Sequence, residues 1–467
     1  MKILLISPPQ PGAARYGKLA AAGSYLPPLG LASLAAMVRD QHEVRIVDGT
    51  VEAVTMAGLE KLIADWRPEV VGMMTLTSTF YAAVALCAAA KRIDGAIVTV
   101  LGGPHPSVQP VESMCDPAVD VVVVGEGEET FRELILALEK RIDLRGVPGL
   151  YLREGEGVVA TPSRPPIADL DALPWPARDL LPMHLYHPSP MHYRKLPAFS
   201  VMCGRGCPYQ CTFCSCSKVF PGRMRLRTPE NVMAEIRMLV DRFGAREILI
   251  WDDLFGISRS WTRKFCELIA PLNLSWSAWM RVDTVNPELL ELMASSGCWH
   301  ISYGVESGNQ GVLDSIRKEI TLEQVRSAFA WTHAAGMEAR GTFILGFPGE
   351  TPATMRETID LAISIDADYA QFQLLTPYPG SELWESTQSS QRSEDLAQYT
   401  IWFPVFVPEG MTANALMKMQ REAYRCFYLR PGYIWQRLRA IRSLADLRRN
   451  LVGGLSVLRL SANFSAG

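Results

Sequence analysis

Runs of apolar and β-branched residues alternate with segments of helical periodicity along the first third of the chain. The strand-like runs lie at Lys2–Ser7, Glu43–Val47, Val70–Leu76, Ile97–Leu101 and Val119–Val124. The helical segments between them include Leu29–Val38, Ala57–Trp66 and Ala82–Lys91. Continuous apolar strands joined by helical crossovers are typical of a parallel sheet that is covered on both faces. The pattern therefore predicts a parallel-sheet α/β domain over residues 1–145.

A second series of strands and helices follows between residues 197 and 386. Its predicted strands are Phe199–Met202, Glu247–Trp251, Ser275–Met280, Ile301–Val305, Thr342–Leu345 and Tyr369–Leu375. Its predicted helices include Pro229–Phe243, Ser260–Ile269, Pro287–Ser296, Leu322–Ala335 and Met355–Ile365. Successive β–α units of this kind predict an open, partial (β/α)6 barrel, and the chemistry of such a barrel is expected at the carboxyl ends of its strands.

The segments outside these two series differ from them in amino-acid composition. Residues 146–196 are rich in proline and contain a Gly-Glu-Gly turn at 155–157, which predicts a hairpin followed by an extended linker. Residues 387–467 are predicted to form a helical C-terminal region that closes the pocket of the barrel. This region carries eight arginines between Arg421 and Arg449. The arginine-rich stretch fits either the polar face of a capping helix or peripheral contact with an anionic membrane.

Composition narrows the classes of function. The net charge of −3 provides no basic field for nucleic acid, so a small-molecule substrate is expected. The longest uncharged run, Val70–Ala90, is interrupted by hydroxyl residues at 75 and 77–79, which favours a strand, a loop and a helix over a transmembrane segment. The apolar N-terminal run is too short for a signal peptide, and a cytoplasmic location is expected.

The cysteines are the strongest chemical signal, because five of the ten lie between Cys203 and Cys216. A local cluster of this kind in a long chain indicates metal binding rather than disulfides. Within it, Cys207, Cys211 and Cys214 have the spacing Cys-x3-Cys-x2-Cys. Iron–sulfur cubes normally take four cysteine ligands, so three closely spaced thiolates would leave one iron open. A zinc site completed by Cys203, Cys216 or a histidine is the alternative, although no second pair of ligands with zinc spacing is present.

This cysteine motif, together with Phe213 and later strand-end motifs, resembles the radical S-adenosylmethionine (SAM) superfamily over about residues 197–386. The resemblance implies that Cys207, Cys211 and Cys214 hold a 4Fe-4S cluster whose open iron binds SAM. It also implies reductive cleavage of SAM to a 5′-deoxyadenosyl radical, with an electron donor such as flavodoxin or ferredoxin. The SAM-binding positions implied by the resemblance are Phe213, Asp252, Arg281, Glu306, Ser307, Gly346 and Tyr378.

The first domain resembles the cobalamin-binding domain of a large subgroup of this superfamily, which has a flavodoxin-like (Rossmann-like) fold. The positions that correspond to the cobalamin loops are Thr75, Leu76, Thr77, Gly102, Gly103, Pro104, Gly125, Glu126 and Gly127. The loop after the first strand lacks the Asp-x-His-x-x-Gly motif of many cobalamin enzymes, so no histidine from that loop ligates cobalt. His105 is expected to be a turn residue. The same loop lacks Gly-x-Gly-x-x-Gly, which disfavours a dinucleotide.

These resemblances imply a cobalamin-dependent enzyme that methylates an unactivated carbon of a small metabolite. Radical rearrangement or oxidative cyclisation without methyl transfer, as in the anaerobic magnesium-protoporphyrin monomethyl ester cyclase, is the alternative. A transfer-RNA methylthiotransferase is disfavoured by the acidic net charge and by the lack of a second cysteine triad. The complete set of cluster cysteines disfavours a cobalamin sensor with a degenerate catalytic half.

Overall fold

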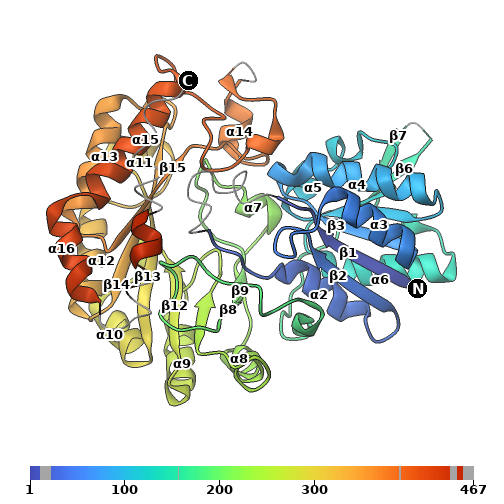
Figure 1. Ribbon diagram of the computed structural model, residues 1–467, viewed down its shortest axis with the longest axis horizontal. Helices are drawn as coiled ribbons and strands as arrows, with labels where there is room; N and C mark the ends of the chain where they lie inside the picture. The colour runs from blue at the N-terminus through green and yellow to red at the C-terminus, as the bar shows by residue number, and fades with distance from the viewer. Residues whose placement is uncertain (11–22, 156, 389–390, 442–446, 448–449, 456–467) are drawn as a thin grey trace.

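Two mostly parallel sheets organise the chain, and they lie in separate halves of the molecule (Figure 1). This computed structural model describes residues 1–10, 23–155, 157–388, 391–441, 447 and 450–455. The first sheet contains, in spatial order, β2 (Glu43–Asp48), β1 (Lys2–Ser7), β3 (Val70–Met74), β4 (Val98–Gly102), β5 (Val121–Val123), β6 (Leu150–Glu154) and β7 (Gly157–Ala160). The second contains β15 (Tyr369–Leu374), β14 (Glu338–Leu345), β13 (Cys298–Glu306), β12 (Ser275–Met280), β11 (Glu247–Ile250) and β8 (Ala198–Val201).

Helices connect the strands and cover the sheets. Those of the first half are α2 (Leu29–Val38), α3 (Met56–Trp66), α4 (Phe80–Ile93), α5 (Pro104–Val108) and α6 (Gly127–Lys140). Those of the second half are α7 (Cys216–Val219), α8 (Pro229–Phe243), α9 (Arg259–Ile269), α10 (Pro287–Ser295), α11 (Gln310–Ser315), α12 (Leu322–Ala334), α13 (Pro352–Ser364), α14 (Glu382–Ser386), α15 (Ala413–Tyr428) and α16 (Pro431–Ala440). The predicted fold class is confirmed: a flavodoxin-like domain, a partial (β/α)6 barrel and a helical C-terminal region.

Local sequence signals explain why the elements begin and end where they do. In β1, residues 3–6 are completely buried, as expected for a central strand covered on both faces. Helix α8 shows the signals of a helix start and stop. The Thr228 side chain accepts a hydrogen bond from the Asn231 amide, Pro229 occupies the first turn, and Gly244 ends the helix at φ +66°. The start and the end of α8 are therefore specified by residues of the helix itself and its two flanks.

The predicted hairpin belongs to the first sheet rather than to the linker alone. Strand β6 pairs antiparallel with β5, and β7 pairs antiparallel with β6. The sheet therefore extends past the predicted boundary at residue 145. Residue 156 of the predicted turn lies outside the described residues. In the barrel, β13 and β14 begin three and four residues before their predicted starts, because their first residues continue the parallel pairing.

Helix α15 covers the open edge of the barrel at β15. The Gln420 side chain donates to the Phe372 carbonyl at 2.9 Å, and the Tyr424 hydroxyl accepts from the Phe372 amide at 3.2 Å. The Tyr428 hydroxyl likewise bonds both backbone groups of Ala370. These side chains satisfy backbone groups that an edge strand would otherwise leave unpaired. The part of the helical region that packs on the barrel is thus held by specific polar contacts.

The C-terminal arginine-rich stretch is only partly described. Arg442, Arg448 and Arg449 lie outside the described residues, so the predicted role of the whole stretch stays a prediction. No helix in the described ranges combines the length and the apolar character needed to cross a bilayer.

Candidate functional site

The three cysteines of the motif lie on one loop between a short strand, β9 (Gly204–Arg205), and helix α7. Burial raises the pKa of all three thiols, to about 11 for Cys214, and the neighbouring Cys211 and Cys207 add to the effect there. At Cys211, the cations Lys318 and Arg281 lower the pKa and so partly offset the effect of burial. Burial therefore favours the protonated thiols in the free protein, and a metal that binds them would take them as thiolates.

No group of three His, Cys, Asp or Glu side chains in the described ranges is arranged to hold a metal ion. The assignment of Cys207, Cys211 and Cys214 as cluster ligands therefore stays a prediction from their spacing. Cys203, which the spacing placed outside the ligand set, is buried below the loop. The fit to a three-cysteine cluster site rests on their common loop and on the two cations beside it.

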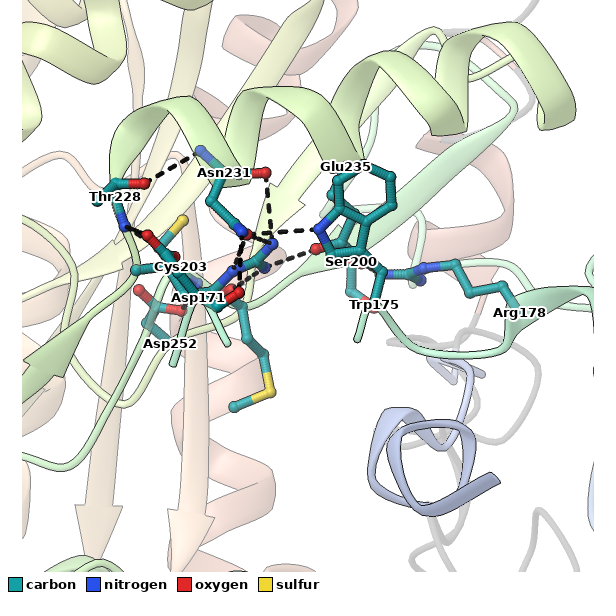
Figure 2. A network of polar contacts seen from close by, with 11 residues as sticks. Asp171, Trp175, Arg178, Ser200, Cys203, Thr228, Asn231, Glu235 and Asp252 are labelled. Atoms are coloured by element: carbon teal, nitrogen blue, oxygen red, sulfur yellow. Dashed lines mark hydrogen bonds and ion pairs between the residues drawn. The ribbon is translucent and has the colours of Figure 1, made fainter. Parts of the chain in front are cut away.

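Two adjacent aspartates after β11 form hydrogen bonds with the start of the loop that carries the three cysteines, which we call the cluster loop. Asp252 accepts a hydrogen bond from the Cys203 amide at 2.7 Å, and Figure 2 shows the two residues side by side. Asp253 accepts from the Gly206 amide at 3.3 Å, and Gly206 has φ +92°. Burial raises the pKa of Asp252 to about 7, and its second oxygen has no partner. Asp252 thus supports the loop, and its predicted contact with SAM stays a prediction.

A polar network around Glu235 of α8 holds the segment that precedes this loop (Figure 2). Arg227 donates to the Met202 carbonyl at 2.9 Å and pairs with Glu235 at 2.6 Å. Arg178 of the linker pairs with the other oxygen of Glu235 at 2.7 Å and donates to the Ser200 carbonyl at 2.8 Å. Glu235 thereby joins the linker to β8 and to the segment that leads into the cysteines.

Arg281 lies directly against the cluster loop at the end of β12. Its guanidinium carbon is 3.5 Å from the ring centroid of Tyr209, which sits between Cys207 and Cys211 in the sequence. The guanidinium also donates twice to Asp283, at 2.9 and 3.0 Å, and once to the Lys318 carbonyl at 2.7 Å. The position agrees with a role at SAM, but Asp283 already neutralises the charge that was expected to meet the methionyl carboxylate.

The end of β13 carries a buried ion pair. Lys318 donates to Glu306 at 2.7 Å, and both side chains are nearly inaccessible to solvent. Glu306 has φ +71°, and the register of β13 with β14 shifts between Gly304 and Glu306. A Cβ atom at Gly304 would lie 2.7 Å from the Glu306 carboxylate, so the glycine makes room for the pair. Strained backbone and bulges of this kind are concentrated at functional sites.

Lys318 is a candidate functional residue that the sequence did not single out. Its Nζ lies 5.8 Å from the ring centroid of Phe213, the aromatic residue beside Cys214. A lysine after a short helix carries no distinctive local signal, because only the tertiary fold brings it to Glu306 and the cluster loop. Phe213 in turn packs edge-on against Phe347 at 5.8 Å.

The remaining predicted SAM positions are distributed around this centre. The Ser307 hydroxyl forms a hydrogen bond with the Thr358 hydroxyl of α13 at 3.3 Å, so its side chain contacts a helix that covers the barrel. Gly346 has φ +99° and donates its amide to Glu350 at 2.8 Å. The Tyr378 hydroxyl donates to the Tyr399 carbonyl at 3.4 Å, and its ring packs against the core of the first domain. The structure thus places Phe213, Arg281 and Glu306 at the cluster loop. The side chains of Ser307 and Tyr378 form hydrogen bonds with Thr358 and Tyr399.

A cavity of about 340 Å³ lies between the first sheet and the cluster-loop flank. Its lining includes six of the predicted cobalamin positions: Gly102, Gly103, Pro104, Gly125, Glu126 and Gly127. The opposite wall contains Met202, Gly204 and Arg205, which lead into the cysteine loop. A Cβ atom at Gly103 would lie 3.0 Å from a backbone oxygen, at φ +110°, so this close approach requires glycine. A glycine-lined apolar wall fits a large flat cofactor laid against the sheet.

The other three predicted cobalamin positions do not line this cavity. Thr75 is completely buried, and the Thr77 hydroxyl bonds His105 Nδ1 at 3.2 Å. The 3-10 helix that contains Thr77 packs against residues 396–398 of the C-terminal region. His105 also lies outside the cavity lining, and burial lowers its pKa to about 4. The binding role of Thr75, Leu76 and Thr77 stays a prediction.

Ion pairs hold the two halves together at the mouth of this cavity. Glu126 pairs with Arg225 and, at 3.5 Å, with Arg205, while Glu128 pairs with Arg205 at 2.5 Å. Burial alone would raise the pKa of Glu126, but the two arginines lower it overall. Because Arg205 and Arg225 flank the cysteine loop on β9 and β10 (Arg225–Leu226), this ion-pair clamp links the cavity to the cluster loop. Glu126 therefore has a structural role that its predicted cobalamin contact did not include.

Comparison with known proteins agrees with this architecture. Residues 18–135 match the family described as the B12 binding domain, and residues 201–362 match the Radical SAM superfamily. The chain is 38% identical to the uncharacterized methyltransferase PH0819 of Pyrococcus horikoshii, over 92% of this chain and 93% of that protein. It is 30% identical to the anaerobic magnesium-protoporphyrin IX monomethyl ester cyclase of Rubrivivax gelatinosus, over 93% of this chain and 78% of that protein.

The solved structure of the radical SAM methyltransferase TsrM from Kitasatospora setae, with cobalamin and a 4Fe-4S cluster bound, has the same fold. Its TM-score is 0.69 at 18% identity, over 92% of this chain and 89% of that one. Both domain matches and the full-length relatives agree with the two halves of the structure. The chain therefore belongs to the radical SAM superfamily, in the group whose members carry a B12-binding domain before the radical SAM domain.

Proposed function

We propose that this radical SAM enzyme uses cobalamin to methylate an unactivated carbon of a small molecule. The observation that carries the proposal is the shared cavity. Its one wall is formed by the glycine-rich loops of the B12-binding domain, and its other wall leads directly into the cysteine loop. This arrangement supports a reaction in which both cofactors act on one substrate, because the two binding loops are not separated by a domain.

The residues of the chain have distinct parts in this proposal. When bound, the cluster supplies the electron that cleaves SAM and cobalamin supplies the methyl group. Cys207, Cys211 and Cys214 would hold the cluster, and a flavodoxin or ferredoxin would deliver the electron. Arg281 and Lys318 lie beside the cysteine loop and partly oppose the rise that burial causes in the pKa of Cys211.

The polar groups at the strand ends would orient SAM. Glu306 is held by Lys318 at 2.7 Å and has an acceptor oxygen suited to an ammonium or ribose hydroxyl. Phe213 and Phe347 form an apolar wall that shields the same region from water. A fixed arrangement of these side chains would hold SAM in one orientation, and correct placement of the reacting groups lowers the activation barrier of the reaction.

Anaerobic reconstitution with iron, sulfide and cobalamin, followed by reduction in the presence of SAM, tests the proposal. We expect iron and sulfide in equal amounts, bound cobalamin, and release of 5′-deoxyadenosine. A product that is one methyl group heavier than the substrate would support methylation. A product with unchanged carbon count would instead support cyclisation, the activity named for the Rubrivivax gelatinosus relative. Zinc in place of iron, or a loaded protein that releases no 5′-deoxyadenosine, would contradict both.

A further inference from the structure

A second cavity, of about 420 Å³, lies on the inner face of β14 and β15. Helices α15 and α16 and the linker residues around His192 complete its walls. The lining is largely apolar and includes Trp402, Tyr428 and Leu438. Its described lining residues include Arg340 and Arg437 but no aspartate or glutamate. The cavity therefore combines apolar surface with two guanidinium groups.

Arg340 stands out in this lining because it is buried and has no counter-ion among the residues that the structure describes. Its side chain is 2% exposed, and its guanidinium donates to His192 Nε2 and to the Gln371 carbonyl oxygen, both on neutral side chains. The guanidinium carbon lies 5.1 Å from the ring centroid of Trp279, and Nε has no partner. Burial lowers the pKa of Arg340 to about 10, so the side chain is still charged at neutral pH.

His192 supplies a second unused donor at the same place. Because arginine can only donate, His192 Nε2 must accept from Arg340, and the ring proton is therefore on Nδ1. Nδ1 is buried and has no hydrogen-bond partner. Arg340 Nε and His192 Nδ1 are thus two buried N–H groups for which the described protein provides no acceptor.

Other deeply buried arginines in the described ranges do have counter-ions. Arg178 pairs with Glu235 at 2.7 Å, and Arg281 pairs with Asp283 at 2.9 Å. The second arginine of the cavity, Arg437, pairs with Asp368 at 2.6 Å. An isolated buried guanidinium is strongly unfavourable unless an anion is present. None of the described residues places a carboxylate at Arg340, which points to an anion as its missing partner.

We propose that this cavity binds the anionic end of an otherwise apolar substrate, with its carboxylate or phosphate oxygens on Arg340 and His192. The inference rests on the proposed function, since it names the substrate class of the same barrel. The register of β13 with β14 gives the distance between this anion site and the reacting end of the barrel. Arg340 pairs with Ser302 of β13, and Glu306 lies four residues further along that strand. Four residues span about 13 Å, so the anion would lie about that far from the reacting end of the barrel.

Binding of simple amphiphiles to the anaerobically purified full chain tests this inference. The probes are dodecanoate, dodecyl phosphate and dodecan-1-ol, and tryptophan fluorescence reports binding because Trp279 contacts Arg340. A charge-assisted hydrogen bond should make at least one anion bind roughly tenfold or more tightly than the alcohol. The preferred anion then distinguishes a carboxylate from a phosphate substrate. Arg340→Met should abolish the preference, and Arg340→Lys should retain part of it.

Stability provides a matched control. Arg340→Met should leave the denaturation midpoint unchanged or raised, because it removes an uncompensated buried charge. Arg178→Met should lower the midpoint, because it removes the Glu235 ion pair, and should leave the anion preference intact. Equal binding of the alcohol and both anions by the wild type, or a preserved preference in Arg340→Met, would overturn the inference. So would a loss of stability in Arg340→Met that matches Arg178→Met. These measurements need no SAM cleavage, so they are independent of the 5′-deoxyadenosine assay.

Discussion

Loss of the Glu126 carboxylate should loosen the contact between the two halves of the enzyme. The Glu126 side chain is 4% exposed, and its partners Arg225 and Arg205 are 15% and 16% exposed. Breaking a buried ion pair typically costs about 3–5 kcal/mol. Glu126→Gln retains one carbonyl oxygen as acceptor, so we expect the lower end, about 3 kcal/mol. That energy corresponds to roughly a 100-fold increase in the population that opens at this interface.

Hydrogen exchange on peptides that contain β9 and β10 measures this opening directly. Glu129→Gln is a matched control on α6, the helix that directly follows Glu126, because Glu129 pairs with Arg132 at 2.8 Å on the surface, where the side chains are 34% and 46% exposed. A surface pair of this kind contributes about 0–1 kcal/mol, and its loss should leave exchange in β9 and β10 nearly unchanged. Equal protection of these strands in the two variants would refute the reasoning that the clamp holds the cluster loop to the B12-binding domain.

Three further outcomes follow from the site and the fold. Cys211→Ala should abolish iron and sulfide incorporation, whereas Cys216→Ala should not; an equal loss in both would contradict the ligand set. Gly103→Ala should reduce the cobalamin retained on gel filtration, because its Cβ would lie 3.0 Å from a backbone oxygen, and the unhindered Gly95→Ala is the control. An aspartate partner raises the pKa of His333, so its charged form stabilises the fold below about pH 6.5, and this contribution is lost as pH rises through the folded pKa. The stability difference between wild type and His333→Gln should therefore shrink as the pH rises above about 6.5, and a constant difference would argue against the ion pair.

Sequence alone determined the order of strands and helices and the identity of the cysteine loop. These features depend on residues close together in the chain: apolar runs, capping residues such as Thr228, and the spacing of Cys207, Cys211 and Cys214. The predicted cobalamin loops at 102–104 and 125–127 were noticed for the same reason, because small residues directly follow buried strands, and both line the cavity of the first domain. Short-range patterns of this kind survive without knowledge of tertiary packing.

Only the tertiary structure decided which charged groups meet. Asp252, which the sequence predicts at SAM, accepts a hydrogen bond from the Cys203 amide, 49 residues away. Arg340 meets His192 across 148 residues, and Glu126 meets Arg225 across 99. Such pairs leave no periodic trace in the sequence, because each partner alone is an ordinary polar residue of a loop or strand. The burial that makes an unpaired Arg340 chemically significant arises only when the barrel, its linker and α15 pack together.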